Sequence, residues 1–304
     1  MPISNFPNGF AAGVTIQNMP VLNNYGGDVY WVDSGAGSNG NPGTFSQPFS
    51  TIDYTVGRCT ANNGDTVMVK PGHTETVIAA AGLAIDVAGI TFIGLGNGSD
   101  RPTINYTTAV GADMDIDAAN TTMVNFLFTG NVDALTGPID INAADCSLYN
   151  IETRDETGQT TDFIATDANA DRLLIDGWVH RGAAADGGDS AITIVGGDDI
   201  EIRNFNIYGN FDQGAIEQVT TAGVRINIHD GYIWNAGSED LAVVLKSDTT
   251  GRVGPNIQAK LADNAANITE SFVGAAAQFF QPIEIVNLVG ETSMKTNITA
   301  STDA

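Results

Sequence analysis

The sequence predicts an all-β fold, a parallel β-solenoid in which one kind of coil is repeated. Three observations support this. The chain of 304 residues holds 35 glycines, short segments of alternating apolar and polar residues recur along it, and a column of Gly, Asn or Asp returns about every 26 residues. That period is shorter than the roughly 30 residues of a βαβ unit, and no helical periodicity lies between the columns. Stacked coils of short strands fit this pattern best.

The column marks a corner of each coil. Gly, Asn and Asp tolerate the left-handed backbone conformation, so their return at one position indicates a sharp turn between two strands. Two places before each corner stands a large apolar residue, which we expect in the core. The corner residues, separated by 31, 25, 26, 28 and 26 positions, are Gly94, Asn125, Asn150, Asp176, Asn204 and Asp230, and the preceding apolar residues are Phe92, Met123, Leu148, Leu174, Ile202 and Ile228.

Three regions follow from this alignment. Residues 1–28 are expected to form an extended arm, and residues 29–253 the solenoid of roughly eight coils, with a cap helix at about 50–61 that begins at Ser50 or Thr51. The column is lost from Gly254 onward, so residues 254–304 are expected to be a C-terminal cap or extension. Variable loops rich in Gly and Asp, such as "RDETGQTT" and "WNAGSED", should emerge on one side.

The charge and hydrophobicity of the chain restrict the classes of partner that it can bind. With 12 Lys and Arg against 36 Asp and Glu, the formal charge is −24, which repels a phosphate backbone and argues against nucleic acid. No segment approaches the roughly 20 apolar residues of a membrane helix. The first ten residues show no basic and apolar secretory pattern. We therefore expect synthesis in a cytoplasm and no membrane partner.

Residues 29–77, with "GTFSQPFSTI" followed by "GDTVMVKPG", resemble the first coil of right-handed parallel β-helix proteins of the pectate-lyase-like superfamily. The chain as a whole, including "FPNGFAAGVTI" and "TNITASTDA", is similar to bacteriophage and prophage structural proteins. The resemblance implies a right-handed, single-stranded β-helix, usually trimeric, in a virion.

Catalytic residues are not expected. Asp198 and Asp199 could serve as acid and base, but the "GHG" and "RIK" motifs of galacturonan hydrolases are absent. Arg101 beside Asp100 lacks the second arginine of the calcium-dependent lyases. We expect Asp198 and Asp199 to be corner residues, and we predict that the protein is not an enzyme and needs no cofactor.

An acidic run is a weak candidate for a metal site. Alternation along "ADMDIDAAN" directs its acidic side chains outward, and the next coil places another carboxylate opposite, which a divalent cation could neutralise. A solvated acidic face is the simpler interpretation. The residues are Asp113, Asp115, Asp117 and Asp140, while His73, His180 and His229 share no metal spacing and are expected at the surface or in turns.

Aromatic residues near the corners are expected to line a lateral face, and two more near the C-terminus are expected to close the last coil. Such a face can pack against another subunit, face solvent, or stack on sugar rings. The uncharged, apolar arm suits contact with another protein, although it could also fold back on its own solenoid. The predicted subunit-interface residues are Trp178, Tyr208, Tyr232, Trp234, Phe279 and Phe280, and the predicted capsid-contact residues are Phe6, Phe10, Val14, Ile16, Met19, Val21 and Leu22.

Together these observations predict a non-enzymatic, homotrimeric capsid decoration (cement) protein. It would bind the major capsid protein on the outer surface of a virion made in a bacterial cytoplasm, using several arms at once. The alternative is a tail protein of the tail-fibre or tailspike type that binds, and could also cleave, a host-surface glycan.

Overall fold

The computed structural model describes residues 27–183, 188–237, 241–261, 272–274, 276–280 and 282–287, and the backbone of two paired strands, β1 (Thr15–Ile16) and β2 (Met19–Pro20). Every side chain predicted for the capsid-contact arm lies outside the described residues. Within the described part, no helix is long and apolar enough to cross a membrane.

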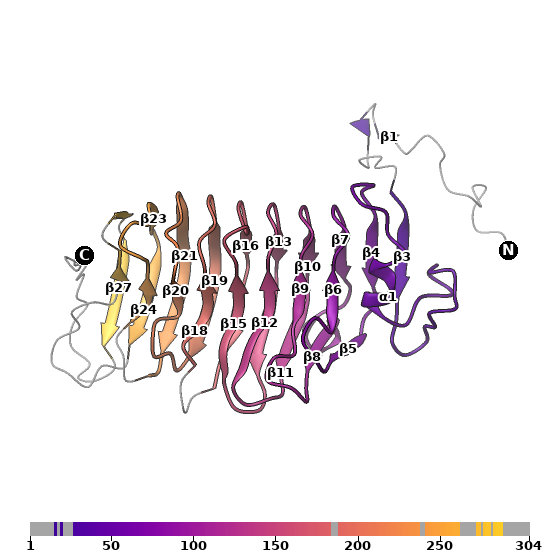
Figure 1. Ribbon diagram of the computed structural model, residues 1–304, viewed down its shortest axis with the longest axis horizontal. Coiled ribbons are helices and arrows are strands. Elements are labelled where there is room, and N and C mark those ends of the chain that lie inside the picture. Colours follow the sequence, from indigo (N-terminus) through magenta and orange to yellow (C-terminus); the bar gives the residue numbers. More distant parts are fainter. Residues whose placement is uncertain are drawn as a thin grey trace.

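The described chain is a parallel β-solenoid of about eight coils, as predicted (Figure 1). Each coil contributes strands to three faces, and each strand pairs in parallel with its counterpart one coil away. Face 1 consists of β3 (Val29–Val32), β4 (Thr66–Val69), β7 (Thr91–Gly94), β10 (Thr122–Val124), β13 (Ser147–Tyr149), β16 (Leu174–Asp176), the first halves of β19 (Glu201–Gly209) and β21 (Ile226–Asn235), β23 (Gly251–Val253) and β26 (Ala277–Phe279).

Face 2 follows face 1 around the predicted corner. It consists of β5 (Thr74–Val77), β8 (Thr103–Tyr106), β11 (Leu127–Gly130), β14 (Glu152–Asp155), β17 (Val179–Arg181), the second halves of β19 and β21, β24 (Ile257–Leu261) and β27 (Ile283–Asn287). The expected variable loops leave from the ends of these strands. They lead to face 3, which consists of β6 (Leu83–Ile85), β9 (Met114–Ile116), β12 (Leu135–Ile141), β15 (Thr160–Thr166), β18 (Ser190–Ile194), β20 (Ile216–Gln218), β22 (Val243–Val244) and β25 (Phe272–Val273).

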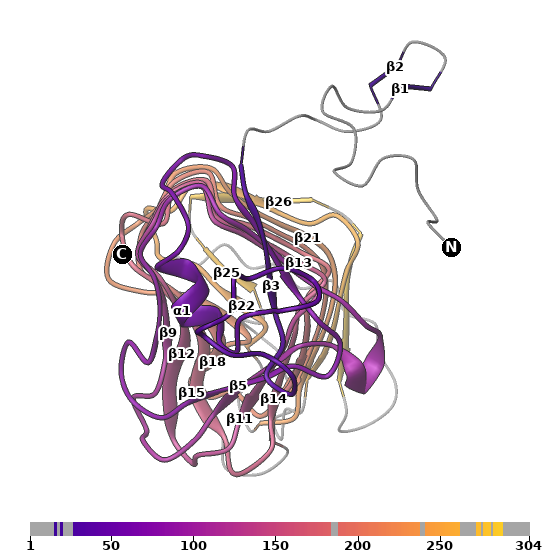
Figure 2. The same ribbon diagram turned by 90° about the vertical axis from the view of Figure 1, so that its right-hand side faces the viewer.

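The strands of the three faces surround the interior of the solenoid (Figure 2). Inward side chains from all three faces form one continuous core, because equivalent residues stack in register along the axis. Such alternation places every second residue of a strand in the core and the others in solvent. Five of the six apolar residues predicted to point inward do so and are fully buried: Phe92, Met123, Leu148, Ile202 and Ile228.

The predicted corner column lines up one coil above another. Asn125, Asn150 and Asn204 have positive φ values of 66°, 51° and 54°. Their amides link neighbouring coils, since Asn150 Nδ2 donates to Asn125 Oδ1 at 3.0 Å and Asn204 Nδ2 donates to Asp176 Oδ1 at 2.7 Å. The asparagines therefore both turn the chain and bond the coils together.

One coil departs from the predicted alignment by a residue. Asp176 pairs in register with Tyr149 and Arg203, which precede the corner residues of their own coils. Gly177, at φ 78°, takes the left-handed position instead. As a result Ile175 points into the core and Leu174 points outward. The sequence did not reveal this, because Leu174 and Ile175 are both apolar and the alternating pattern fits either register.

The first and last corners also differ from expectation. Gly94 is not in the left-handed region; it is required by close approach, since a Cβ there would lie 2.4 Å from the carbonyl oxygen of Asn125. At the other end the solenoid does not stop at residue 253. Asn256, at φ 60°, donates to Asp230 Oδ1 at 2.6 Å, and β24 and β27 continue face 2. The extra residue of "GPN" hid this corner in the sequence.

A second left-handed column, between face 3 and face 1, escaped the sequence analysis. It recurs every 25 to 27 residues, and two of its five members are arginine, a residue type that seldom adopts positive φ. Arg172 and Arg225 each form a two-point ion pair with the aspartate one coil earlier, Asp145 and Asp199 respectively. The members of this second corner column are Asn120, Asp145, Arg172, Asp199 and Arg225.

The predicted cap helix is α1 (Ile52–Val56), shorter than the expected 50–61. Its N-cap is Thr51, whose Oγ1 accepts a hydrogen bond from Tyr54 N at 3.3 Å. Ile52 and Val56 are buried, so the helix covers the N-terminal end of the core (Figure 2). This protects apolar residues that the first coil would otherwise expose.

Candidate functional site

Face 2 carries two adjacent outward rows of side chains near the C-terminal end, each row contributed by successive coils. We call the row formed by Arg181, Tyr208, Trp234 and Lys260 the aromatic column. The parallel row formed by Asn206, Tyr232, Gln258 and Glu284 is the polar column.

The aromatic column is tightly organised. The rings of Tyr208 and Trp234 lie 4.9 Å apart in an edge-on arrangement, and Lys260 Nζ lies 3.9 Å from the centre of the Trp234 ring. Arg181 donates to Asn206 Oδ1 at 3.2 Å. Neither Arg181 nor Lys260 forms an ion pair within the described part of the chain. The column therefore presents an aromatic pair between two uncompensated cations.

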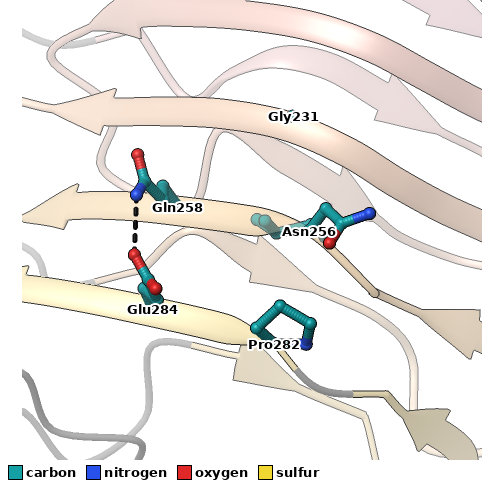
Figure 3. Close-up of a pocket in the computed structure, with 6 residues that line it drawn as sticks. Gly231, Asn256, Gln258, Pro282 and Glu284 are labelled. Atoms are coloured by element: carbon teal, nitrogen blue, oxygen red, sulfur yellow. Dashed lines mark hydrogen bonds between the residues drawn. The ribbon is translucent and has the colours of Figure 1, made fainter.

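A small cleft of about 250 Å³ adjoins these columns (Figure 3). Gln258 and Glu284 lie at one side of it, joined by a 2.6 Å hydrogen bond from the amide to the carboxylate, and Asn256 and Pro282 lie at the other. The neighbouring Tyr232 has a phenol whose pKa is raised by burial, and at neutral pH this phenol is a hydrogen-bond donor. The cleft offers donors and acceptors beside an aromatic surface.

Trp178, predicted for the same surface, is buried instead. The one-residue shift at Gly177 turns its side chain into the core, where it is 0% exposed. Its Nε1 donates to Thr153 Oγ1 at 2.9 Å, and Thr153 lies 2.8 Å from His180 Nδ1. Because Thr153 accepts from Trp178, its own hydroxyl hydrogen is free for His180. These two hydrogen bonds explain why a polar residue, Thr153, occupies a buried, inward position of β14.

The other predicted interface residues lie at the surface or near it. Tyr208, Tyr232 and Trp234 point outward and are half-buried. Phe279 packs against the core cluster, whereas Phe280 is 42% exposed and lies beside Arg252. Their role in a subunit interface stays a prediction.

The catalytic candidates weighed in the sequence are engaged in structural contacts. Asp199 belongs to the second corner column and is paired with Arg225, while Asp198 accepts a hydrogen bond from Val224 N at 2.8 Å. Arg101 is largely buried and bonded to Glu152, which lies two coils further along face 2. All three side chains therefore hold different coils together.

The predicted acidic residues gather on face 3. Asp115 and Asp140 stand opposite each other in register, as expected from the alternation. Burial and the neighbouring carboxylates of Asp113 and Asp117 raise the pKa of Asp115 to about 6, and burial raises the pKa of Asp113 and Asp140 as well. Among the residues the structure describes, no three His, Cys, Asp or Glu side chains are grouped to hold a metal ion.

This acidic face predicts a pH dependence of stability. A carboxyl whose pKa is raised by folding stabilises the protein below its unfolded pKa, and this stabilisation is lost as the pH rises through the folded value. Asp115→Asn should therefore raise the stability at pH 7 by about 1 kcal/mol after solvent screening, and flatten the fall in stability between pH 4 and 6. Urea unfolding at several pH values measures both effects. An unchanged pH profile would contradict the prediction.

The histidines correct another expectation. His73 and His180 are 1% exposed, not at the surface. Burial lowers the pKa of His180 to about 3, so it is neutral in the core. His229 is mostly covered and contacts the carboxylates of Glu201 and Asp230. Polar partners make these covered positions acceptable, and each histidine has at least one partner on another coil: Ser34 for His73, Thr153 for His180 and Glu201 for His229.

Comparison with known proteins finds matches of low similarity, and these are among solved structures. No family model and no curated protein sequence matches the chain. A rhamnogalacturonan lyase is 13% identical, with a TM-score of 0.44 over 88% of this chain and 89% of its own. A GH136 lacto-N-biosidase from Eubacterium ramulus is 12% identical, with a TM-score of 0.48 over 82% of this chain and 56% of its own. At such values the likeness identifies no site and no substrate.

The comparisons nevertheless correct one expectation. The prediction that this protein is not an enzyme is overturned, because the matching solved structures belong to a lyase and a biosidase. None of the matching proteins is described as a phage protein.

Proposed function

We propose that the protein binds a glycan along face 2, on the aromatic and polar columns. The observation that carries the proposal is the grouping of Tyr208, Trp234 and Tyr232 with amide and carboxylate side chains on consecutive coils. This corresponds to the tail-protein alternative of the sequence analysis.

The chemistry of this surface suits a sugar polymer. Sugar rings have apolar C–H faces and hydroxyl edges, so they bind where aromatic rings lie next to hydrogen-bonding groups. Gln258 and Glu284 provide such groups beside the rings. Because the coils repeat at about 4.8 Å, a polymer lying along the axis can contact several coils in succession, and weak contacts add up.

The test is glycan-array screening followed by calorimetry with the glycans that bind. Trp234→Ala should weaken binding 10- to 100-fold, since buried aromatic contacts dominate such interfaces. Tyr149→Ala removes a half-buried, outward aromatic ring from face 1 and serves as the matched control, with affinity expected within two-fold. Incubation of each bound glycan with the protein, followed by an assay for reducing or unsaturated ends, measures cleavage.

Two outcomes would overturn the proposal. One is equal loss of affinity in Trp234→Ala and Tyr149→Ala, or no binding to any glycan. The other is a Trp234→Ala protein that dissociates from an oligomer to a monomer in light scattering, which would make the aromatic column a subunit interface.

Capsid decoration by a homotrimer remains the competing prediction from the sequence resemblance. It predicts hundreds of copies per particle, whereas a tail protein predicts a few trimers. Densitometry of purified virions distinguishes the two.

A further inference from the structure

A second cleft, of about 670 Å³, lies on face 1 beside the second corner column, at the C-terminal end of the described solenoid. The coils that contain β19, β21, β23 and β26 contribute to it, and it is separate from face 2. We call it the Arg252 cleft; it is lined by Asp199, Arg225, Asn227, Arg252, Gln278 and Phe280, among others.

Arg252 is the distinctive residue of this cleft. Its side chain is exposed and makes no hydrogen bond or ion pair within the described part of the chain. The guanidinium lies 5.8 Å from the centre of the Phe280 ring, which is 42% exposed. A cation–π contact of this kind orients the guanidinium and leaves its N–H groups free.

The remaining charges in the cleft are balanced. Both carboxylate oxygens of Asp199 accept hydrogen bonds from Arg225, so the opposite charges of these two side chains cancel. Hydrogen bonds with Asn256 and His229 lower the pKa of Asp230, and the charge of Arg252 adds a smaller effect. The cleft therefore keeps one uncompensated positive charge in a chain of net charge −24.

Neutral donors accompany this charge. Gln278 stands next to Arg252 in register and Asn227 stands on its other side. The Gln278 amide has no hydrogen-bond partner among the described residues, and the Asn227 amide donates to Arg225 O at 3.2 Å, which leaves its carbonyl oxygen open. A planar guanidinium flanked by amides and an aromatic ring matches a sugar that bears a carboxylate.

We propose that the Arg252 cleft binds a carboxylate-bearing sugar unit, so that the glycan recognised by this protein is acidic. The inference rests on the proposed glycan function. Phe280 lines this cleft and Pro282 lines the cleft of face 2, so the two sites are close along the chain, on either side of the Asn256 corner.

The experiment compares acidic and neutral probes by calorimetry on the full chain. The acidic probes are trigalacturonate, a hyaluronan tetrasaccharide and sialyllactose, and the neutral ones are methyl-esterified trigalacturonate and lactose. Arg252→Gln removes the charge at the cleft. Arg58→Gln makes the same change on an exposed arginine at the opposite end of the solenoid and is the matched control. Phe280→Leu tests the ring that orients Arg252.

At least one acidic probe should bind, with affinity reduced ten-fold or more by Arg252→Gln and less by Phe280→Leu, and unchanged in Arg58→Gln. Affinity should also fall with salt, since the contact is ionic. The inference is overturned if no acidic probe binds, if neutral and acidic forms bind equally, or if Arg252→Gln binds like the parent.

These outcomes separate the inference from the proposed function. Binding that depends on Trp234 but not on Arg252 or on the carboxylate overturns only the inference. Binding that depends on Arg252 but not on Trp234 overturns the assignment of face 2 and leaves the Arg252 cleft in place.

Discussion

Replacing Thr153 with valine should destabilise the protein by about 3 kcal/mol, although the two side chains have nearly the same shape. Thr153 is fully buried and is the only link between Trp178 Nε1 and His180 Nδ1 that the described residues show. Valine would leave an N–H and a ring nitrogen buried without partners, and each such loss costs about 1–3 kcal/mol.

Chemical denaturation measures this effect, and Thr122→Val is its control. Thr122 points outward from face 1, and its change should stay within about 0.5 kcal/mol. Tryptophan fluorescence should also change in Thr153→Val, because the Trp178 N–H loses its acceptor. If the two variants unfold at the same denaturant concentration, the Trp178–Thr153–His180 chain does not stabilise the core.

Glu75→Leu should lower the free energy of unfolding by a similar amount, about 3 kcal/mol. The destabilisation should be concentrated at the N-terminal cap. Glu75 Oε2 accepts from Ile52 N at 2.9 Å and lies 3.1 Å from His73 Nε2. Ser34 N donates to His73 Nδ1 at 2.9 Å, so the ring proton is on Nε2 and that nitrogen donates to Glu75. Leucine would leave two buried donors without an acceptor and release the start of α1.

Hydrogen exchange shows where this loss occurs. Exchange should become faster at Ile52–Val56 and in the first coil, and remain unchanged in β19, because each coil packs mainly against its neighbours and β19 lies several coils away. Glu156→Leu, at an exposed ion pair with a 3.9 Å separation, is the control and should change stability little. Uniformly faster exchange over the whole solenoid would contradict a local role for Glu75.

The sequence predicted the aromatic residues of the candidate site, but it did not predict which other side chains lie beside them. The sequence predicted Tyr208, Tyr232 and Trp234 on one lateral face, because each lies two or four places after a corner residue. It did not place Arg181 and Lys260 with them, and it missed the Arg252 cleft entirely. These neighbours come from different coils, and the length of each intervening loop decides their register.

The errors have a common physical origin. At Asp176 two registers satisfied the alternation, and the stacked strands on either side selected the one that buries Ile175 and Trp178. At Arg172 and Arg225, ion pairs to the coil below offset the cost of a left-handed backbone that arginine seldom adopts. In both places a contact about 26 residues away outweighed the preference of the residue itself.

The sequence by itself determined that the chain coils, since the alternation of apolar residues and the turn-forming Gly, Asn and Asp act within a few neighbouring positions. Only the tertiary structure decided the second corner, the buried histidines, the burial of Trp178 and the side chains that meet on face 2 and in the Arg252 cleft. Those features depend on stacking between coils, where packing and hydrogen bonds from residues distant in the chain set the energy of each position.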